Sequence, residues 1–224
     1  RSLDDAFMRS LKERGWRVIA TARKKGDIKR LESEGLEVVP LEYRDAKSIA
    51  KCADETLKRT DGKLTAMFNN GAYGQPGAVE DLPVDVLREQ FEANFFGWHD
   101  LTRRLIPAMR AQGHGRIVQC SSVLGLVSLK YRGANNASKF ALEVLTDALR
   151  QELAGTGLHV SLIEPGPIVT RFGENALAAY RANIDLENSV HAEVYRQRIA
   201  AMEAGGAVRF KLGPEAVLEK LIHA

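Results

Sequence analysis

A hydroxyl, an amide and an amine stand at spacings that could bring them together around one carbonyl group. Ser122 follows a β-rich run, where open α/β sheets bind ligands, and its hydroxyl can donate a hydrogen bond to a carbonyl oxygen. Lys139 follows Asn135 by one helical turn, so both side chains share a helix face. The pattern predicts a carbonyl-polarising site. The alternatives are a serine that only caps its turn and a lysine that is only solvated.

The elements that would position these residues alternate between strand and helix along a single domain, residues 1–224. The expected strands are 17–21, 36–41, 64–68, 115–120 and 159–163. The expected helices are 3–14, 26–34, 46–60, 84–112 (interrupted at Asn94) and 134–154. Strands separated by helices of this length form parallel, right-handed crossovers with helices on both faces of one sheet. The pattern predicts a Rossmann-type, doubly wound α/β fold.

The first strand of that fold and its glycine-rich loop are not found in the sequence. In the strand order 3-2-1-4-5-6, the strand before the opening helix is central. Without it, strands 17–21 and 64–68 would face a slot of unpaired backbone groups, which are costly to bury. No glycine precedes Gly15, so the turn that holds a pyrophosphate at a helix N-terminus is also not found. We expect the complete molecule to have that strand.

Composition limits the function. A formal net charge of +3 on 224 residues is too small to indicate nucleic-acid binding. No run approaches the roughly 18 apolar residues of a membrane span. The five histidines show no metal-ligand spacing, and two cysteines, Cys52 and Cys120, fit a reducing cytoplasm better than a disulfide framework. We expect a cytoplasmic protein without a metal.

Five clusters, in this order, resemble the short-chain dehydrogenase/reductase family. They are Asn69-Asn70-Gly71-Ala72, Asn94, Ser121-Ser122, Ala137-Ser138-Lys139 and Pro165-Gly166-Pro167-Ile168-Val169-Thr170. Each is weak alone, but together they are specific, and the resemblance covers nearly the whole chain. It implies that Ser122 is the active-site serine, that Lys139 holds the nicotinamide ribose, and that Asn94 supports a proton relay. The alternative for Asn94 is a polar break in an amphipathic helix.

Asn135 is the departure from the family, which has a tyrosine four residues before the lysine. A phenol, with a pKa of about 10, can serve as a general acid or base. A carboxamide forms hydrogen bonds but does not titrate in the useful range. Because general acid–base catalysis is typically worth about 10²- to 10⁴-fold, its loss should nearly silence the reaction. Tyr131 could replace the phenol only if its loop bent inward.

The resemblance also assigns residues to the cofactor. Those expected to contact it, besides Lys139, are Arg23, Glu42, Asn70, Gly71, Ala72, Pro165, Gly166 and Thr170. Folds that prefer NAD carry an acid after the second strand, whereas those that prefer NADP place a cation near the 2′-phosphate. This chain has Arg23 there and no acid, and an arginine can clamp a phosphate. NADP(H) is therefore expected over NAD(H).

The resemblance implies an NADP(H)-dependent alcohol/carbonyl oxidoreductase that acts on a small, largely apolar molecule. Segments 94–97 and 163–167 look like the branch acting on steroids, retinoids or fatty aldehydes, and residues 173–212 like its substrate lid. One alternative is a non-catalytic NADP(H)-binding member, and another is a substitution at position 135 of a working enzyme. Helices 84–112 and 134–154 correspond to those that pair family subunits, so we expect a homodimer or homotetramer.

Overall fold

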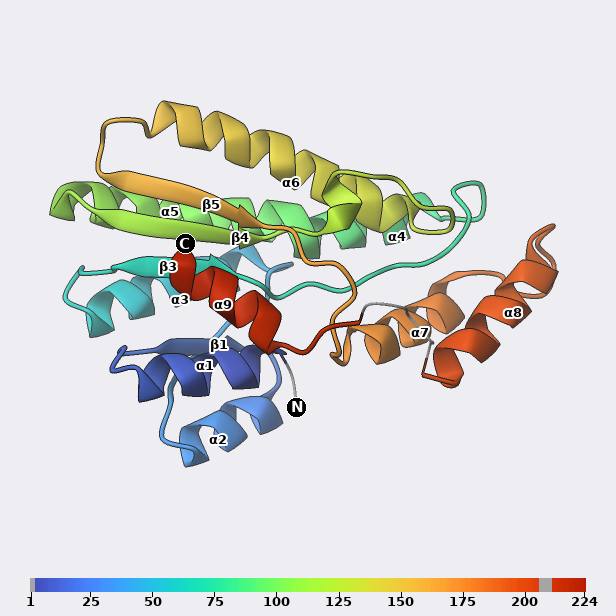
Figure 1. The fold of residues 1–224 in the computed structure, drawn as a ribbon, viewed down its shortest axis with the longest axis horizontal. Coiled ribbons are helices and arrows are strands. Elements are labelled where there is room, and N and C mark those ends of the chain that lie inside the picture. The colour runs from blue at the N-terminus through green and yellow to red at the C-terminus, as the bar shows by residue number, and fades with distance from the viewer. Residues whose placement is uncertain (1–2, 206–210) are drawn as a thin grey trace.

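Strands and helices alternate along the chain in the computed structural model, which describes residues 3–205 and 211–224 (Figure 1). The strands are β1 (Ile19–Ala22), β2 (Glu37–Pro40), β3 (Ala66–Asn69), β4 (Gly115–Cys120) and β5 (Leu158–Ile163). The helices are α1 (Leu3–Glu13), α2 (Lys25–Ser33), α3 (Ala46–Arg59), α4 (Val84–Phe91), α5 (Gly97–Gln112), α6 (Gly133–Glu152), α7 (Phe172–Asn183), α8 (Ala192–Glu203) and α9 (Glu215–His223). The predicted strands are present, with ends displaced by one or two residues, as is usual at element ends.

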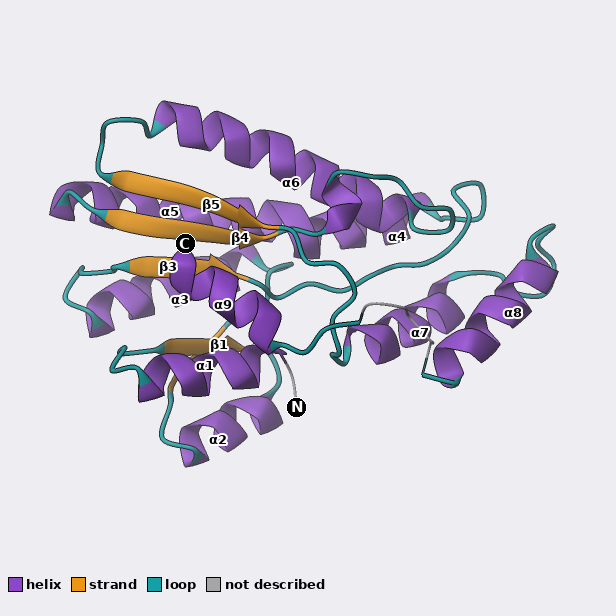
Figure 2. Cartoon of the chain, in the orientation of Figure 1, coloured by secondary structure: helices purple, strands orange, loops and turns teal. Residues whose placement is uncertain are grey.

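All pairing between the named strands is parallel, and it forms two separate sheets within the described residues (Figure 2). One sheet pairs β1 with β2, placing Ala20 opposite Val38. The other has the order β3-β4-β5, with Ile117 of β4 between Met67 and Val160. No ladder joins β1 to β3. The predicted doubly wound α/β fold is confirmed. The backbone hydrogen bonding between strands stops between β1 and β3, the two strands that were expected to lie on either side of the absent strand.

Helices cover both faces of the strands and hold the two sheets together. On one face, Ile49 of α3 and Leu105 of α5 share a buried cluster with Val39 of β2 and Ile117 of β4. On the other face, α1 and α9 pack against the β3-β4-β5 sheet, and Phe7 of α1 stacks on Phe68. Both sheets are therefore joined by shared apolar packing, although no backbone ladder connects them.

The helix predicted over 84–112 consists of three parts. Between α4 and α5 the chain forms one π-helical turn, Glu92–Phe96, with Asn94 near its centre. A π-turn inserts an extra residue into the helix, and such turns occur frequently at functional sites. The predicted interruption at Asn94 is confirmed as this wider turn.

Beyond β5, the predicted lid region contains α7 and α8, which lie at the end of the molecule where α6 begins (Figure 1). Tyr180 and Tyr195 from these helices form an apolar cluster with Ala78 and Ile184. Residues 206–210 of the predicted lid lie outside the described residues. In the described part of the chain, no helix combines the length and apolar character needed to cross a membrane.

Candidate active site

A buried cation lies at the carboxyl end of β4. The Nζ of Lys139 donates a 2.6 Å hydrogen bond to the carbonyl oxygen of Cys120, the last residue of that strand. The same ammonium lies 4.5 Å from the centre of the Trp98 ring, within the range of a cation–π interaction. Only 5% of Lys139 is exposed, and this burial lowers the pKa of its ammonium to about 8. A proton on this group is held weakly for a lysine.

The first turns of α6 are anchored to the loop that follows β4. Asn136 donates from Nδ2 to the carbonyl oxygens of Leu124 and Val127, at 2.8 and 2.6 Å. Ser138 is fully buried and donates to the carbonyl oxygen of Asn135, at 3.0 Å. The two Asn136 bonds fix the helix start against the loop after β4, and one turn into the helix Lys139 reaches the end of that strand.

Asn135 carries a buried oxygen that lacks a partner. It precedes Lys139 by one turn on the same helix, and 4% of it is exposed. Its Oδ1 accepts no hydrogen bond from any group in the described part of the chain. An unsatisfied buried acceptor costs about 1–3 kcal/mol, and such an atom calls for an explanation. A donor from a bound ligand would supply the missing bond.

Ser122 lies beside this pair but is engaged locally. Its Oγ accepts a 3.1 Å hydrogen bond from the backbone of Leu124 and donates a long one, 3.4 Å, to the carbonyl oxygen of Pro165. The bond from Leu124 is the turn-capping contact that the sequence analysis gave as the alternative role of Ser122. Ser122 nevertheless stands only two residues beyond Cys120, which holds the Lys139 ammonium. The structure thus brings the predicted hydroxyl and ammonium to one strand end.

Asn94 fixes the loop that follows β3. The side chain is fully buried, donates 2.8 Å from Nδ2 to the carbonyl oxygen of Tyr73, and accepts 3.2 Å at Oδ1 from the Tyr73 amide. Gln90, one turn earlier, donates to the same carbonyl oxygen at 2.9 Å. The Asn94 side chain therefore bonds both the N–H and the C=O of Tyr73, as the backbone of a neighbouring strand would. Its part in a proton relay stays a prediction.

Trp98 is a site residue that the sequence reasoning missed. It is fully buried, its Nε1 donates a 3.0 Å hydrogen bond to the Gly71 carbonyl oxygen, and its ring faces the Lys139 ammonium. The available signal was its position one helical turn after Asn94, on the same face of the helix. Trp98 connects the predicted turn at Gly71 with the predicted lysine.

Comparison with known proteins decides the family. The family model for short chain dehydrogenase matches residues 3–181 of this chain. The chain belongs to the short-chain dehydrogenase family.

Curated relatives agree with this membership. The chain is 44% identical over 214 residues to an uncharacterized oxidoreductase, YbbO, of Escherichia coli, covering 96% of the chain and 74% of that protein. It is 34% identical over 170 residues to human retinol dehydrogenase 8, covering 73% of the chain and 53% of that protein.

Solved structures match as well. A short-chain dehydrogenase from Streptomyces avermitilis matches with a TM-score of 0.72 and 26% identity, over 99% of this chain and 89% of that one. A variant of actinorhodin polyketide ketoreductase with NADPH matches with a TM-score of 0.75 and 25% identity, over 99% and 84% of the two chains. The fold shared with these proteins extends over nearly the whole of this short-chain dehydrogenase.

The cofactor residues expected near β1 and β2 contact each other in this dehydrogenase. Arg23 forms an ion pair with Glu42, 3.3 Å from Nη1 to Oε2. The Arg23 side chain is more than half exposed. Arg44 pairs with the same carboxylate and also with Glu89, at 3.2 and 2.6 Å. The sequence analysis expected Arg23 and Glu42 each to contact the cofactor, without a contact between them. Their contact means that Arg23 shares its charge with a carboxylate.

The other predicted cofactor residues lie in the loops after β3 and β5. Ala72 packs against the cluster around Trp98, next to Gly71. The carbonyl oxygen of Pro165 accepts a 3.1 Å hydrogen bond from the Val123 amide, joining the loops after β4 and β5. Thr170 accepts from the Phe172 amide at 3.1 Å. Asn70 and Gly166 belong to these same two loops.

The residues present at the end of β4 fit the nicotinamide part of a dinucleotide. Lys139 offers a buried cation, and the Asn135 Oδ1 is an acceptor without a partner in the described residues. Lys139, Asn135 and the loops after β3 and β5 are the groups that could hold a nicotinamide and its ribose.

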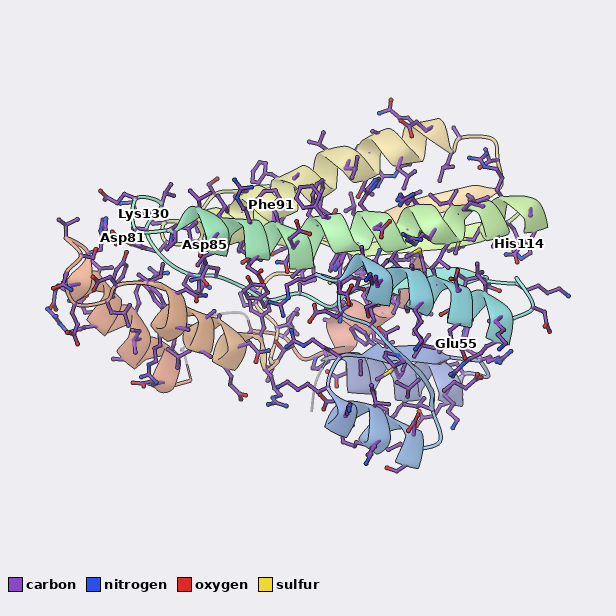
Figure 3. All side chains as sticks on the ribbon, turned by 180° about the vertical axis from the view of Figure 1, so that it is seen from behind. Glu55, Asp81, Asp85, Phe91, His114 and Lys130 are labelled. Atoms are coloured by element: carbon purple, nitrogen blue, oxygen red, sulfur yellow. The ribbon has the colours of Figure 1, made fainter. Side chains whose placement is uncertain are left out.

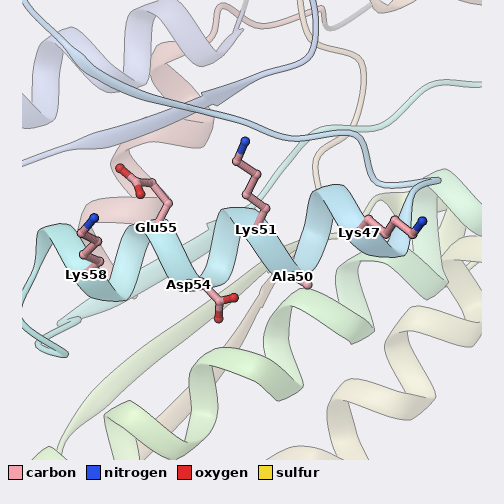
Figure 4. Close-up of a pocket in the computed structure, with 6 residues that line it drawn as sticks. All are labelled: Lys47, Ala50, Lys51, Asp54, Glu55 and Lys58. Atoms are coloured by element: carbon pink, nitrogen blue, oxygen red, sulfur yellow. The ribbon is translucent and has the colours of Figure 1, made fainter.

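A hollow of about 450 Å³ on α3 lies apart from these residues (Figure 4). It is lined by Lys47, Ala50, Lys51, Asp54, Glu55 and Lys58, all from that one helix. Figure 3 places Glu55 well away from Lys130 and Asp81, which lie at the lid end. A solvated helix face with mixed charges explains the hollow, and we assign it no function.

Proposed function

We propose that this protein is an NADP(H)-dependent alcohol/carbonyl oxidoreductase for a small molecule, and that Asn135 impairs its catalysis. The observation that carries the proposal is the buried Lys139 ammonium next to a buried amide whose oxygen is unpaired. The likeness to retinol dehydrogenase 8, at 34% identity, supports a carbon-bound hydroxyl as the reacting group and an apolar substrate. Membership of the family supports the reaction class but not these finer choices.

The residues of the chain would each have a defined part. When bound, NADPH supplies the hydride. Ser122 would turn its hydroxyl from Pro165, 3.4 Å away, to the substrate carbonyl oxygen, a small loss because that bond is long. Lys139 would hold the nicotinamide ribose through its buried ammonium. Asn135 can hold a ligand hydroxyl but cannot surrender a proton, which is why we expect slow turnover.

The preference for NADP(H) rests on charge at the end of β1. Arg23 follows Ala22, the last residue of that strand, and residues 20–25 contain no acid. Glu42 offsets part of the Arg23 charge, so a 2′-phosphate would have to displace or share that pair. The ketoreductase variant solved with NADPH, at 25% identity, supports the same choice.

A second candidate function is a non-catalytic NADP(H)-binding protein. Asn135 favours it, since the family's proton-transferring group is replaced by an amide that does not titrate. The buried, hydrogen-bonded states of Lys139 and Asn94 favour an enzyme instead, because a binding surface alone does not need a cation at a strand end. Both candidates predict that NADPH binds.

The deciding experiment changes the amide to a phenol in the whole protein. We expect Asn135→Tyr to raise the rate of NADPH oxidation by about 10²- to 10⁴-fold with a panel of aldehydes and ketones. Asn135→Phe is the matched control, because it adds the same ring without the hydroxyl and should give no gain. NADPH absorbance measures turnover, and NADPH fluorescence measures binding in all three proteins.

The outcomes separate the candidates. A gain in Asn135→Tyr alone supports an impaired enzyme. NADPH binding without turnover in any of the three proteins supports the non-catalytic protein. Substantial and equal turnover in the unchanged protein and in Asn135→Tyr would show that proton transfer does not depend on position 135.

Two coarser proposals go with this function. Apolar side chains at Phe140 and Val144, one turn apart on α6, are exposed and support a homodimer or homotetramer formed through that helix. Cys52 and Cys120 are both buried and form no disulfide, which supports a reducing, cytoplasmic location. Sedimentation of the unchanged protein and of Val144→Asp tests the first proposal, because an interface charge should shift the protein toward monomer.

A further inference from the structure

Arg132 and Arg198 both adjoin Tyr131, and neither has a carboxylate partner within the described residues. Arg132 stands directly before α6, and within the described residues its guanidinium has no hydrogen bond or ion pair. Arg198 of α8 lies over the Tyr131 ring, 4.9 Å from its centre, and forms no ion pair in the same part of the chain. Burial, and secondly the charge of Arg198, lowers the pKa of Arg132. Two like charges near each other favour an anion between them.

Five acids of this region are engaged with other groups. Figure 3 shows Asp81 and Lys130 at this end of the molecule, near the lid helices. The engaged pairs are Glu80 with His191, Asp81 with Ser189 and Tyr195, Asp185 with Asn188, Glu193 with Arg196, and Glu203 with Arg181. The two arginines are left without a carboxylate partner within the described residues.

The hydroxyl of Tyr180 is buried without a partner in the described residues, and the Tyr180 ring contacts Tyr195, which also contacts Tyr131. Tyr180, on α7, is 0% exposed, and its Oη forms no hydrogen bond with any described group. Burial raises the pKa of Tyr180 to about 12, although the charges of Arg198 and Arg132 act in the opposite direction. The phenol therefore stays protonated at neutral pH and is a donor without an acceptor.

A strained residue sets the position of Arg132. Tyr131 has φ 64°, a left-handed conformation that is uncommon for a bulky residue. It is held by its carbonyl oxygen, which accepts from the Gly77 amide at 3.2 Å, and by its hydroxyl, 3.3 Å from Nδ1 of His191. Such strain persists where surrounding contacts enforce it, often at ligand sites. Here it fixes the direction in which the chain enters Arg132 and α6.

We propose that Arg132, Arg198 and Tyr180 bind a carboxylate on an otherwise apolar substrate, which makes the substrate class oxo- or hydroxy-carboxylic acids. The two guanidinium groups only donate, the phenol has an O–H to donate, and a carboxylate can accept from all three. Arg132 precedes Asn135 by three residues, about 4.5 Å along the helix axis. The carboxylate would lie close to the reacting carbon, so short acids fit. This proposal deepens the proposed function and rests on it for the reacting carbon.

Binding measured without turnover tests the site. The probes are straight-chain oxo-carboxylates from levulinate upward, each compared by calorimetry with its neutral methyl ester. We expect at least one acid to bind about 10- to 100-fold more tightly than its ester. Arg132→Gln and Arg198→Gln should each remove most of this difference. Arg196→Gln is the matched control, because Arg196 lies on the same helix, is exposed and already pairs with Glu193.

The variant Tyr180→Phe separates a role of the hydroxyl in binding from a role in stabilising the fold. Removing a buried hydroxyl without a partner should leave the free protein equally stable or raise its Tm by about 2–4 °C. The same change should weaken binding of the acid several-fold. A fall in Tm, or acids that bind no better than their esters, would overturn the carboxylate site. Neither result touches NADPH binding or the gain of Asn135→Tyr, so failure of this site is distinguishable from failure of the proposed function.

Discussion

The region around β4 and α6 and the region around β1 and β2 are built in opposite ways. Around β4, Lys139, Asn94 and Trp98 are buried, and each forms a short contact with a backbone group or ring. Around β1 and β2, Arg23 and Arg44 are exposed and pair with carboxylates on the surface. The first region is arranged before any ligand arrives. The second has charges that remain free to rearrange.

The difference follows from the cost of burial. A buried donor without a partner loses its hydration and gains nothing in return, so the groups near β4 must be satisfied by the fold or by a ligand. An exposed ion pair is typically worth about 0–1 kcal/mol and is screened by salt. The two regions should therefore respond very differently to equivalent changes.

The largest expected effect is at Asn94. Asn94→Leu removes the bond to the Tyr73 amide, leaving that N–H buried and unpaired, and we expect a loss of about 3 kcal/mol in the free energy of unfolding. The counterpart in the exposed region is Arg44→Ala, which should cost under about 1 kcal/mol. Urea unfolding followed by tryptophan fluorescence measures both. Equal losses would show that the regions do not differ as described.

Two glycines allow a smaller, matched test. A Cβ on Gly97 would lie 2.3 Å from the Tyr43 carbonyl oxygen, whereas a Cβ on Gly26 of α2 meets nothing within 4 Å. Gly97→Ala should cost about 2 kcal/mol or more, because backbone must move to accept it. Gly26→Ala should be neutral or gain up to about 1 kcal/mol, since alanine favours helix more than glycine does. Thermal unfolding of the two variants gives the contrast, and a tolerated Gly97→Ala would contradict the close approach.

The same contrast explains what the sequence could predict. The strand and helix pattern was sufficient for the parallel α/β fold, because alternating elements of this length permit few topologies. Lys139, Ser122 and Asn94 were found because a family motif marks each one. The sequence predicted an interruption of the helix at Asn94. Only the structure shows that the interruption is a π-helical turn.

Residues that act through contacts between distant segments were not predicted. Trp98 of α5 meets Lys139 of α6, and Tyr180 of α7 meets Tyr195 of α8, with 5.3 Å between the ring centres. Neither periodicity nor a motif predicts such a contact, because the contact depends on how whole helices and strands pack against each other. The contact between Arg23 and Glu42 was missed for the same reason, since the two residues follow different strands.

A pH effect of about 1 kcal/mol is expected from Lys139. The unfolded chain keeps the Lys139 proton up to an ordinary pKa of 10.5, whereas burial lowers the folded pKa to about 8. Between these values the unfolded state binds more protons, so stability contributed by this group rises with pH. From pH 8 to 9 we expect a gain of about 1 kcal/mol, at 1.36 kcal/mol for each pKa unit.

Cys52 offsets part of this gain near pH 9, because burial raises its pKa from 9.0 to about 11 and the unfolded thiol loses its proton before the folded one does. Urea unfolding at several pH values measures the gain. Lys139→Met should abolish it, and Lys47→Met, on the exposed face of α3, should leave it intact. A gain that survives Lys139→Met would assign the effect to another group.

The smallest effect on stability should come from Arg23. Arg23→Gln breaks one exposed ion pair at 3.3 Å, so we expect a change of at most about 0.5 kcal/mol that disappears in 1 M salt. Its effect on binding should be larger and selective: about tenfold weaker NADPH with NADH unchanged, because only the 2′-phosphate needs the cation. Fluorescence titration with both dinucleotides checks this, and Lys24→Gln is the neighbouring control. A small loss of stability together with a selective loss of NADPH binding is what we expect of an exposed charge that can exchange its carboxylate partner for a phosphate. Equal weakening of NADPH and NADH binding would mean that Arg23 does not distinguish them.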